Sequence, residues 1–407
     1  MELRNFAELL VYVNNNTTDE LIKSILRYRL EECGIDTPKE EVTLNELRIL
    51  FESYYPDFQQ IADEVCDIKD NLDKYDHLYR NVFKDDISKN VLFHILAYRI
   101  THLIHHRYLK YCLDSTQYFD SRIVHYRKDC TFVDCGGLDG KSSVEFALHC
   151  PDYKRIFIYE PIDEYYDDCR KAVEELGLNN VSIRKAAVSD SAKTLYFDLL
   201  TPGNSRASER GNIEVKAVKI DEDISERIDF IKMDIEGSEL QAIDGASEHI
   251  RKDNPMLAIC VYHKPGDIWQ ITNKINSINS KYNYYLRHHK LNQSETVLYA
   301  VPCCDSASDS YELSITQKRI KYVLMHPGYE PQKVIMEDVF YLYNQFQNHK
   351  KALKNSEKVV HELRDWVSQL EEGKAWLESK INDYRNALQQ KDKEVDELRR
   401  QIEGINK

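Results

Sequence analysis

Apolar residues recur every three or four positions in the first 125 residues of the chain. Segments 46–65 and 90–111 both show this spacing, which places apolar side chains along one face of a helix. Glycine is nearly absent from the region, and no alternation of period two occurs there. The pattern therefore predicts a helical N-terminal region, residues 1–125, that acts as a cap or a dimerisation layer.

The pattern changes at residue 131, where short runs of β-branched and aromatic residues begin. These runs are 131–136, 155–161, 181–188, 194–200, 214–220, 230–235, 256–262, 282–289 and 297–302, and helix-like segments at 142–150, 163–177 and 238–252 separate several of them. Alternation of strands with helices predicts an α/β domain with a mostly parallel sheet, which we place at residues 126–304.

Two connections in this domain depart from the alternation. Only a short polar loop separates 282–289 from 297–302, which predicts an antiparallel hairpin as the last pair of strands. Segment 201–212 is rich in Gly, Pro and Ser and is predicted to be a mobile loop.

Charge becomes dense and balanced after residue 350, and two heptad positions repeat without a break. One is filled by Val360, Val367, Lys374, Ile381, Leu388, Val395 and Ile402, and the other by Leu363, Leu370, Leu377, Tyr384, Lys391 and Leu398. About six heptads in one register predict a coiled coil at 351–407, and an apolar stripe of that length predicts self-association. Residues 305–350 are interpreted as a linker with helical segments.

Composition narrows the function classes. The 407 residues carry a formal net charge of −14, which argues against a broad nucleic-acid interface. The ten cysteines show no C-x-x-C pair, which indicates neither a zinc site nor a disulfide framework. The N-terminus shows no cleavage site of a signal peptide, and the most apolar run, 91–100, is too short to span a membrane. We expect a soluble cytoplasmic protein without a transmembrane segment.

The first strand runs into VDCGGLDGKSS, a glycine turn. Asp134 ends the strand, Gly136 and Gly137 form the turn, and Gly140 lets the next helix begin close to a ligand. A dinucleotide site usually shows G-x-G-x-x-G, whereas Leu138 occupies the position of the middle glycine here. This spacing favours S-adenosylmethionine (SAM) over a dinucleotide.

The second and third strands end in further residues suited to a nucleoside. Glu160 lies 24 residues beyond Gly136, where a carboxylate can accept both ribose hydroxyls. Its alternative role is to cap the following helix, although Asp163 is better placed for that. Backbone amides near Ala187 and Val188 are expected to meet the edge of an adenine.

The run FIKMDIEGSEL at 230–240 places three carboxylates where a buried strand ends. Asp234 is expected at the carboxyl edge of the sheet, facing the methionine ammonium group or the methyl acceptor. Ser238 is predicted to cap the next helix, and Glu239 suits the positive end of that helix. Glu236 has no such structural explanation and is predicted to contact the substrate.

The fifth strand leads to His263, which is predicted to act with Asp234 in catalysis. An imidazole with an ordinary pKa near 6.5 can act as a general base at neutral pH. The alternative is a loop histidine with a structural role. Lys264, Arg287 and His288 are expected to bind the substrate, because Arg287 can pair with a carboxylate or phosphate.

The carboxylates also allow a metal interpretation. Asp234 and Glu236 with His263 could hold a divalent cation that lowers the pKa of the acceptor. The competing interpretation, which we adopt, is that no metal binds and that the acids pair with Lys232, Lys264 or Arg287.

The motifs VDCGGLDGKSS, YEP, AAVSD, IKMDIEGSELQAIDGA and YHKPGDIW together resemble those of the FkbM family of SAM-dependent methyltransferases. The resemblance covers about residues 115–302, and Leu138 departs from the usual pattern. It implies a class I methyltransferase fold, which is Rossmann-like, and O-methylation of sugars or natural products. The coiled coil lies outside this resemblance.

We therefore expect a SAM-dependent O-methyltransferase acting on a sugar, a glycan precursor or a related metabolite. Two alternatives remain: an oxidoreductase that uses NAD or a nucleotide sugar, and a non-catalytic coiled-coil scaffold with a relic methyltransferase domain. The expected partners are a small-molecule or glycan acceptor, a second copy of the chain, and a peripheral link to glycan assembly.

Overall fold

The computed structural model describes residues 3–37, 42–103, 117–120, 122–201, 204–207, 213–290 and 294–303. The chain divides into two units, residues 1–325 and 326–407, and every described residue belongs to the first. The predicted linker at 305–350 and coiled coil at 351–407 lie outside the described residues.

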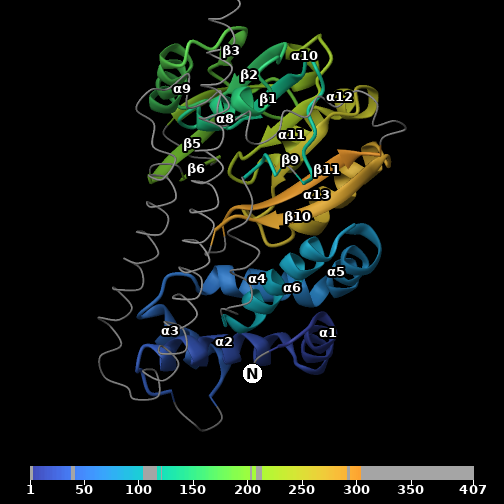
Figure 1. Cartoon of the computed structure of the whole chain (residues 1–407). Coiled ribbons are helices and arrows are strands. Elements are labelled where there is room, and N and C mark those ends of the chain that lie inside the picture. The colour runs from blue at the N-terminus through green and yellow to red at the C-terminus, as the bar shows by residue number, and fades with distance from the viewer. Residues whose placement is uncertain are drawn as a thin grey trace, which may run out of the picture. The chain divides into compact units, whose positions relative to one another are not determined.

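Helices fill the N-terminal region up to Thr101, as predicted (Figure 1). The predicted extension to residue 125 is wrong for 117–120 and 122–125, which are turns and coil, and 104–116 lie outside the described residues. Its elements are α1 (Phe6–Asn15), α2 (Thr18–Glu32), α3 (Leu44–Glu52), α4 (Phe58–Asp70), α5 (Leu72–His77), a π-helical turn η1 (Leu78–Val82) and α6 (Asp86–Thr101). Capping boxes begin α2 and α3, where Thr17 and Thr43 pair with Glu20 and Glu46. Helix α6 is buried on most of its surface, so it forms the centre of this region.

A sheet of seven strands forms the second part of the fold. It contains β1 (Thr131–Cys135), β2 (Arg155–Tyr159), β3 (Val181–Arg184), β8 (Phe230–Met233), β9 (Met256–Cys260), β10 (Tyr282–His288) and β11 (Thr296–Pro302). Their order is β10-β11-β9-β8-β1-β2-β3, and only β11 runs antiparallel to its neighbours. The predicted fold class, a mostly parallel Rossmann-like sheet with a terminal hairpin, is confirmed.

Alternate side chains of the strands face two separate apolar cores. In β1, Val133 belongs to one core and Phe132 to the other, and Leu257 and Ala258 of β9 divide in the same way. Helices α8 (Lys141–His149) and α9 (Asp163–Glu175) contribute to the core of Phe132. Helices α10 (Ile220–Asp223), α11 (Glu239–Gly245), α12 (Ser247–Lys252) and α13 (Asp267–Ile278) contribute to the other. Burial on both faces explains why these strands appear as continuous apolar runs.

A second, smaller sheet has the order β4-β7-β5-β6. It consists of β4 (Ala187–Val188), β5 (Lys193–Thr201), β6 (Asn204–Ala207) and β7 (Ile213–Val218). The sequence pattern did not separate these strands from the main sheet. It also assigned 204–207 to a loop, which is wrong, because β6 pairs with β5 there. Among the described residues between β5 and β7 there is only β6, and a connection this short favours antiparallel pairing over a crossover into the main sheet.

The N-terminal helices pack against the β10 edge of the main sheet. Phe83 forms a β-bridge with Tyr284, and Lys84 N–H donates to the Tyr284 carbonyl at 3.2 Å. Arg287 of β10 pairs with Asp85 before α6. The helical region therefore covers an edge strand that would otherwise expose unpaired backbone groups.

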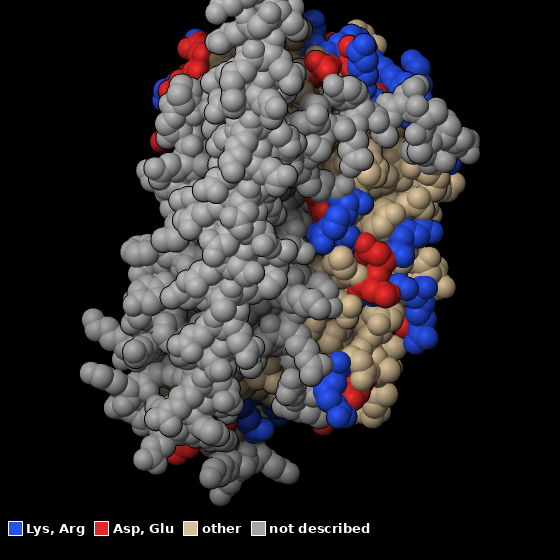
Figure 2. All heavy atoms as spheres, viewed as in Figure 1, with Lys and Arg blue, Asp and Glu red and all other residues tan. Residues whose placement is uncertain are grey.

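The visible described surface in Figure 2 mixes the two signs of charge, with Lys and Arg interspersed among Asp and Glu. Among the described residues, no helix combines the length and apolar character that crossing a membrane requires.

Candidate active site

The site lies where the strand order reverses. The chain passes from β1 through β2 to β3 on one side and then returns to β8 on the other side of β1. Crevices at the carboxyl ends of strands beside such a reversal are where ligands bind in doubly wound sheets. A cavity of about 450 Å³ is present there, lined by residues that follow β1, β2 and β8.

The glycine turn after β1 forms one wall of this cavity. Gly136 has a φ of 84°, and a Cβ there would come within 1.9 Å of the Asp234 carbonyl oxygen. A Cβ on Gly137 would lie 2.5 Å from Ile158. The turn therefore fits between β2 and the end of β8 only without side chains, as predicted.

Asp134 and Gly140 support this wall without lining the cavity. Asp134 is fully buried and accepts hydrogen bonds from Ser142 Oγ at 2.5 Å and Ser143 Oγ at 2.7 Å. Gly140 begins α8 with a φ of 76°, and a Cβ there would lie 3.1 Å from Cys169 Cα. Both residues therefore fix α8 against its surroundings from outside the cavity lining, and their contact with a cofactor stays a prediction.

Lys232 links Asp134 to the glycine turn. Its Nζ lies 3.0 Å from Asp134 Oδ1 and donates to the Gly136 carbonyl at 2.6 Å. Burial disfavours the charged amine, but Asp134 and Asp234 outweigh that effect and raise the pKa of Lys232. Lys232 is therefore a buried cation that neutralises part of the acid cluster.

Glu160 is held at the cavity by two backbone groups. Its Oε2 accepts from Leu138 N–H at 2.9 Å and its Oε1 from Ile162 N–H at 3.0 Å. Burial raises the pKa of Glu160, although these two bonds oppose the shift. A carboxylate accepts about four hydrogen bonds, so two positions remain for a ligand. The expectation that Asp163 caps α9 is wrong, because Ile162 occupies the cap position.

Asp234 also lines the cavity and accepts hydrogen bonds from two tyrosines. Its Oδ2 accepts from Tyr118 Oη at 2.6 Å, and its Oδ1 accepts from Tyr262 Oη at 3.1 Å. Burial alone would raise the pKa of Asp234, but Lys232, His263 and the Tyr118 hydrogen bond lower it. The side chain stays 21% exposed, so an ionised carboxylate remains open to a ligand.

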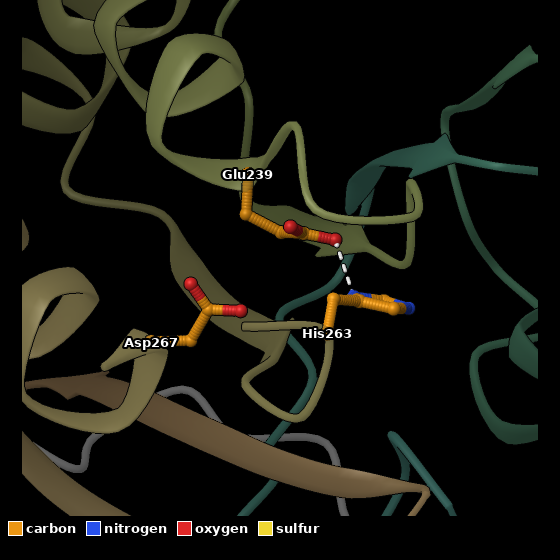
Figure 3. Close-up of side chains that lie close together, drawn as sticks. All are labelled: Glu239, His263 and Asp267. Carbon is orange, nitrogen blue, oxygen red and sulfur yellow. Dashed lines mark ion pairs between the residues drawn. The ribbon is translucent and has the colours of Figure 1, made fainter. Parts of the chain in front are cut away.

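His263 is enclosed by acids, as Figure 3 shows for two of them, Glu239 and Asp267. Its Nδ1 lies 3.0 Å from Glu239 Oε1, and its Nε2 lies 3.4 Å from Asp234 Oδ1 and 3.8 Å from Glu236 Oε2. Burial disfavours the imidazolium, yet the three carboxylates raise the pKa of His263 to about 9. His263 is therefore protonated at neutral pH, which does not fit the ordinary pKa on which its general-base role was predicted.

Glu239 is the anchor of His263, a role that the sequence did not indicate. It is 1% exposed, and its Oε1 also accepts from Ile235 N–H at 3.0 Å. Ser238 makes no capping hydrogen bond at the start of α11. Glu239 was assigned to the positive end of α11 from the sequence, yet among the acids paired with His263 it lies nearest to the imidazole.

Asp267 completes a group with metal-ligand chemistry. The ligand atoms of Glu239, His263 and Asp267 lie within 4.8 Å of one another. Asp267 Oδ2 accepts from Lys264 N–H at 2.8 Å, and burial and Glu239 raise the pKa of Asp267 to about 6. In this geometry Glu239 pairs with His263, and Asp267 accepts a backbone hydrogen bond. The alternative metal trio of Asp234, Glu236 and His263 has its two acids on the Nε2 side of the imidazole.

Three residues predicted to bind substrate lie away from the cavity lining. Arg287 is 1% exposed, with Nη2 at 2.6 Å from Asp85 Oδ2 and Nε at 3.1 Å from Asp120 Oδ2. His288 is buried and its Nδ1 lies 2.8 Å from Thr296 Oγ1. Lys264 Nζ donates to the Gly237 carbonyl. These partners, and not the place of β10 in the sheet, keep Arg287 and His288 out of the site, because Lys290, which follows β10, does line the cavity.

Of the remaining predicted residues, all but His263 line the cavity; the His263 side chain is 5% exposed and lies behind Asp234 and Glu236. Those that line it are Gly136, Gly137, Glu160, Ala187, Val188, Asp234 and Glu236. Sequence reasoning missed Tyr118, Tyr262, Lys290 and Glu295, which also line it. Only Tyr262 carried a usable signal, because it stands directly before His263 at the end of a predicted strand.

Comparison with known proteins gives this site a family. Residues 134–286 match the model of the methyltransferase FkbM domain, a segment that includes the glycine turn, Glu160, Asp234 and His263. The fold and the site therefore define a Rossmann-like methyltransferase domain. Within that class, residues 134–286 match the FkbM methyltransferase domain, in agreement with the sequence resemblance.

A solved structure supports the assignment. The crystal structure of methyltransferase FkbM from Methylobacillus flagellatus is 26% identical, with a TM-score of 0.51 over 58% of this chain. The match spans 62% of that protein's own length. No curated protein matches the chain.

Two more distant structures share only part of the fold. Aeropyrum pernix fibrillarin, in complex with natively bound SAM, is 12% identical with a TM-score of 0.28, covering 43% of this chain and 67% of that one. A SAM-dependent O-methyltransferase from Thermotoga maritima is 12% identical with a TM-score of 0.29, covering 44% of this chain and 62% of that one. These two similarities say nothing about the residues of the site in this chain.

Proposed function

We propose that the chain is a SAM-dependent O-methyltransferase whose acceptor is a hydroxyl of a sugar, a glycan precursor or a related metabolite. One observation carries the proposal: a single cavity joins Glu160, a carboxylate with free acceptor positions, to Asp234, an ionised carboxylate open to a ligand. The first suits the ribose of a nucleoside and the second suits a reacting hydroxyl or an ammonium group.

The residues near Glu160 fit the nucleoside half of SAM. Ala187 and Val188 line the cavity on the strand after β3, where backbone groups can meet an adenine edge. Leu138 also lines it and is 43% exposed, which leaves an apolar side chain free to cover a ring. The absence of a second glycine at this position supports SAM over a dinucleotide, which needs backbone close to a pyrophosphate.

The residues near Asp234 fit a polyhydroxylated acceptor. Asp234, Glu236 and Glu295 offer carboxylate oxygens, and Tyr118 and Tyr262 offer hydroxyls and aromatic faces. The lysines that line the cavity are Lys141 at the start of α8, buried Lys232 and Lys290. Lys290 pairs with Glu295 at 2.8 Å. Acceptors rich in hydroxyl groups match this lining better than phosphates or carboxylates do.

When bound, SAM supplies an electrophilic methyl group on a sulfonium. Asp234 accepts a hydrogen bond from the acceptor hydroxyl and orients it, while Tyr118 and Tyr262 hold the carboxylate in place. His263 holds a proton while its acid neighbours are unneutralised. The positive charge that SAM would bring beside Asp234 and Glu236 would lower the pKa of His263, because like charges disfavour the imidazolium. His263 does not line the cavity, so the proton that the hydroxyl loses passes to His263 by way of Asp234, whose Oδ1 lies 3.4 Å from His263 Nε2.

Calorimetric titration with SAM, with its demethylated product and with NAD tests the proposal. We expect SAM and the product to bind and NAD not to bind. Binding of NAD alone would favour the oxidoreductase alternative, and binding of none of them would favour the relic-domain scaffold. Turnover of isotopically labelled SAM with fractionated cell glycans, followed by mass spectrometry, then identifies the acceptor.

The cytoplasmic location is part of the same proposal. All eight described cysteines are free thiols, five of them buried, which suits a reducing compartment. Cell fractionation tests this location directly.

A further inference from the structure

Three N-terminal helices converge on one short segment of the methyltransferase domain, Pro265–Trp269. Arg99 of α6 donates from Nη1 to the Pro265 carbonyl at 2.8 Å. Tyr75 of α5 donates from Oη to the same carbonyl at 3.1 Å. Asp67 of α4 accepts from Trp269 Nε1 at 3.0 Å. These contacts join residues at least 166 positions apart in the chain.

The donors are themselves buried and fixed. Arg99 is 4% exposed and Tyr75 is fully buried. Arg99 Nε lies 3.9 Å from Glu64 Oε1. The single hydroxyl proton of Tyr75 is shared between Asp67 Oδ2 at 2.5 Å and the Pro265 carbonyl at 3.1 Å. A buried guanidinium carries a large desolvation cost, and here it is aimed at a backbone carbonyl. Arg99 therefore holds the Pro265 carbonyl in one rigid geometry.

Gly266 is an independent sign of this close approach. A Cβ at Gly266 would lie 3.0 Å from Asp67 Oδ1, 3.1 Å from Trp269 Nε1 and 2.5 Å from Gln270 Nε2. The Lys74 amine also lies 3.6 Å from the centre of the Trp269 ring. Gln270 and Trp269 belong to α13, and Asp67 is the contact that α4 contributes, so a side chain at Gly266 would have to displace a group of the N-terminal helices.

The segment begins two residues after His263. On the other side of the same loop, Lys264 Nζ donates to the Gly237 carbonyl, and Lys264 N–H donates to Asp267 Oδ2. The loop from His263 to Asp267 is therefore held on one side by the N-terminal helices and on the other by the turn that carries Glu236 and Glu239.

We propose that Arg99 and Tyr75 are positioning residues for the active site. By fixing the Pro265 carbonyl, they hold the loop that presents His263 to Glu239 and Asp234. The N-terminal helical region then acts as a clamp on the acid–histidine cluster in addition to covering the sheet edge. This inference needs neither SAM nor an acceptor to be tested, so it can fail or succeed separately from the proposed function.

The test is a pH titration of His263 by NMR in the full-length chain. The resonance is assigned by its loss in His263→Gln. The charged groups facing His263 are Glu239 of α11, Asp234 and Glu236 after β8, and Asp267 of α13. If the loop loosens, His263 moves away from these acids and its pKa falls toward the ordinary value of about 6.5.

Arg99→Met should lower the pKa of His263 by about one pH unit or more from the value near 9. Loss of the Arg99 charge alone would raise that pKa, so the direction separates positioning from simple electrostatics. Arg99→Lys, which keeps a charged donor, should restore most of the shift. Arg80→Met is the matched control, because Arg80 is an exposed residue of the same region that pairs with Asp76.

An unchanged or raised pKa in a folded Arg99→Met protein overturns the inference. If Arg99→Met does not fold, Tyr75→Phe decides, because it removes the second donor with little change in volume. Tyr75→Phe should lower the pKa by a smaller amount, and an unchanged value there overturns the inference equally. Thermal melting of each variant establishes that the titrated protein is folded.

Discussion

Tyr118 and Asp234, 116 residues apart, meet through a hydrogen bond of 2.6 Å from the tyrosine hydroxyl to Oδ2. Burial raises the pKa of Tyr118 well above its ordinary value, so the hydroxyl remains a donor. The contact fixes the carboxylate that we place beside the reacting hydroxyl. It belongs to a segment, 117–120, that lies outside the matched family domain.

Tyr118→Phe should reduce turnover by about ten- to a hundredfold, since a hydrogen bond to a charged group contributes about 1.5–3 kcal/mol. SAM affinity should change much less, because Glu160 and the glycine turn are untouched. Steady-state kinetics and calorimetry separate the two effects. Tyr153→Phe removes a hydroxyl that bonds the Asn179 carbonyl outside the cavity and serves as control. Equal losses in both variants would remove Tyr118 from the mechanism.

Glu160→Gln should weaken SAM binding by about ten- to a hundredfold, or roughly 1.4–2.8 kcal/mol. A carboxamide has one acceptor oxygen, so it cannot serve Leu138 N–H and Ile162 N–H together and also hold a ribose. Titration calorimetry measures the change. Asp163→Asn alters a carboxylate that pairs with Lys185 outside the cavity lining and should bind SAM normally. Unchanged affinity in Glu160→Gln would contradict ribose binding.

His263 should make stability depend on pH in a defined window. Its folded pKa of about 9 lies above the reference value of 6.5. The stabilisation is therefore fully present below about pH 6.5 and is lost as pH rises through about 9. The loss should be on the order of 3 kcal/mol. Urea unfolding across this range measures it.

His263→Gln should flatten that part of the profile, whereas His77→Gln, at an exposed position, should leave it unchanged. A profile that keeps its slope in His263→Gln would assign the effect to other groups. Repeating the wild-type NMR titration with SAM bound should show a lower pKa for His263, as the proposed proton transfer requires.

Arg287→Met should destabilise the fold by about 3–5 kcal/mol, because it leaves Asp85 and Asp120 without their buried cation. SAM affinity of the folded fraction should stay the same, since Arg287 lies away from the cavity lining. Denaturant unfolding and calorimetry measure the two quantities. Arg122→Met, at a partner of Asp120 that is 40% exposed, should cost far less. A selective loss of SAM or acceptor binding would restore the substrate role first predicted for Arg287.

Deletion of 351–407 should lower the oligomeric state, as the unbroken heptad register predicts. SAM binding should survive, because the site residues all precede residue 304. Light scattering and calorimetry provide the two measurements. A truncated protein with the mass of the full-length oligomer would show that another surface drives assembly.

The local sequence pattern was sufficient to predict the strands of the main sheet and the residues at their carboxyl ends. Runs such as 131–136 and 230–235 are apolar because both faces of the sheet are buried, and that composition is visible without coordinates. Gly136, Glu160 and Asp234 follow these strands directly. Parallel strands carry such residues to one edge, so their meeting at the cavity could be predicted.

Long-range contacts were not visible in the same way. The sequence by itself determined the alternation of strand and helix, the glycine turn and the acids that follow β2 and β8. Only the tertiary structure decided that Tyr118 binds Asp234, that Glu239 anchors His263 and that Arg287 serves the N-terminal helices. Each of these depends on the order of strands in the sheet and on burial beside other charges. Those relations set both the neighbours and the pKa of a side chain, and neither is encoded in local spacing.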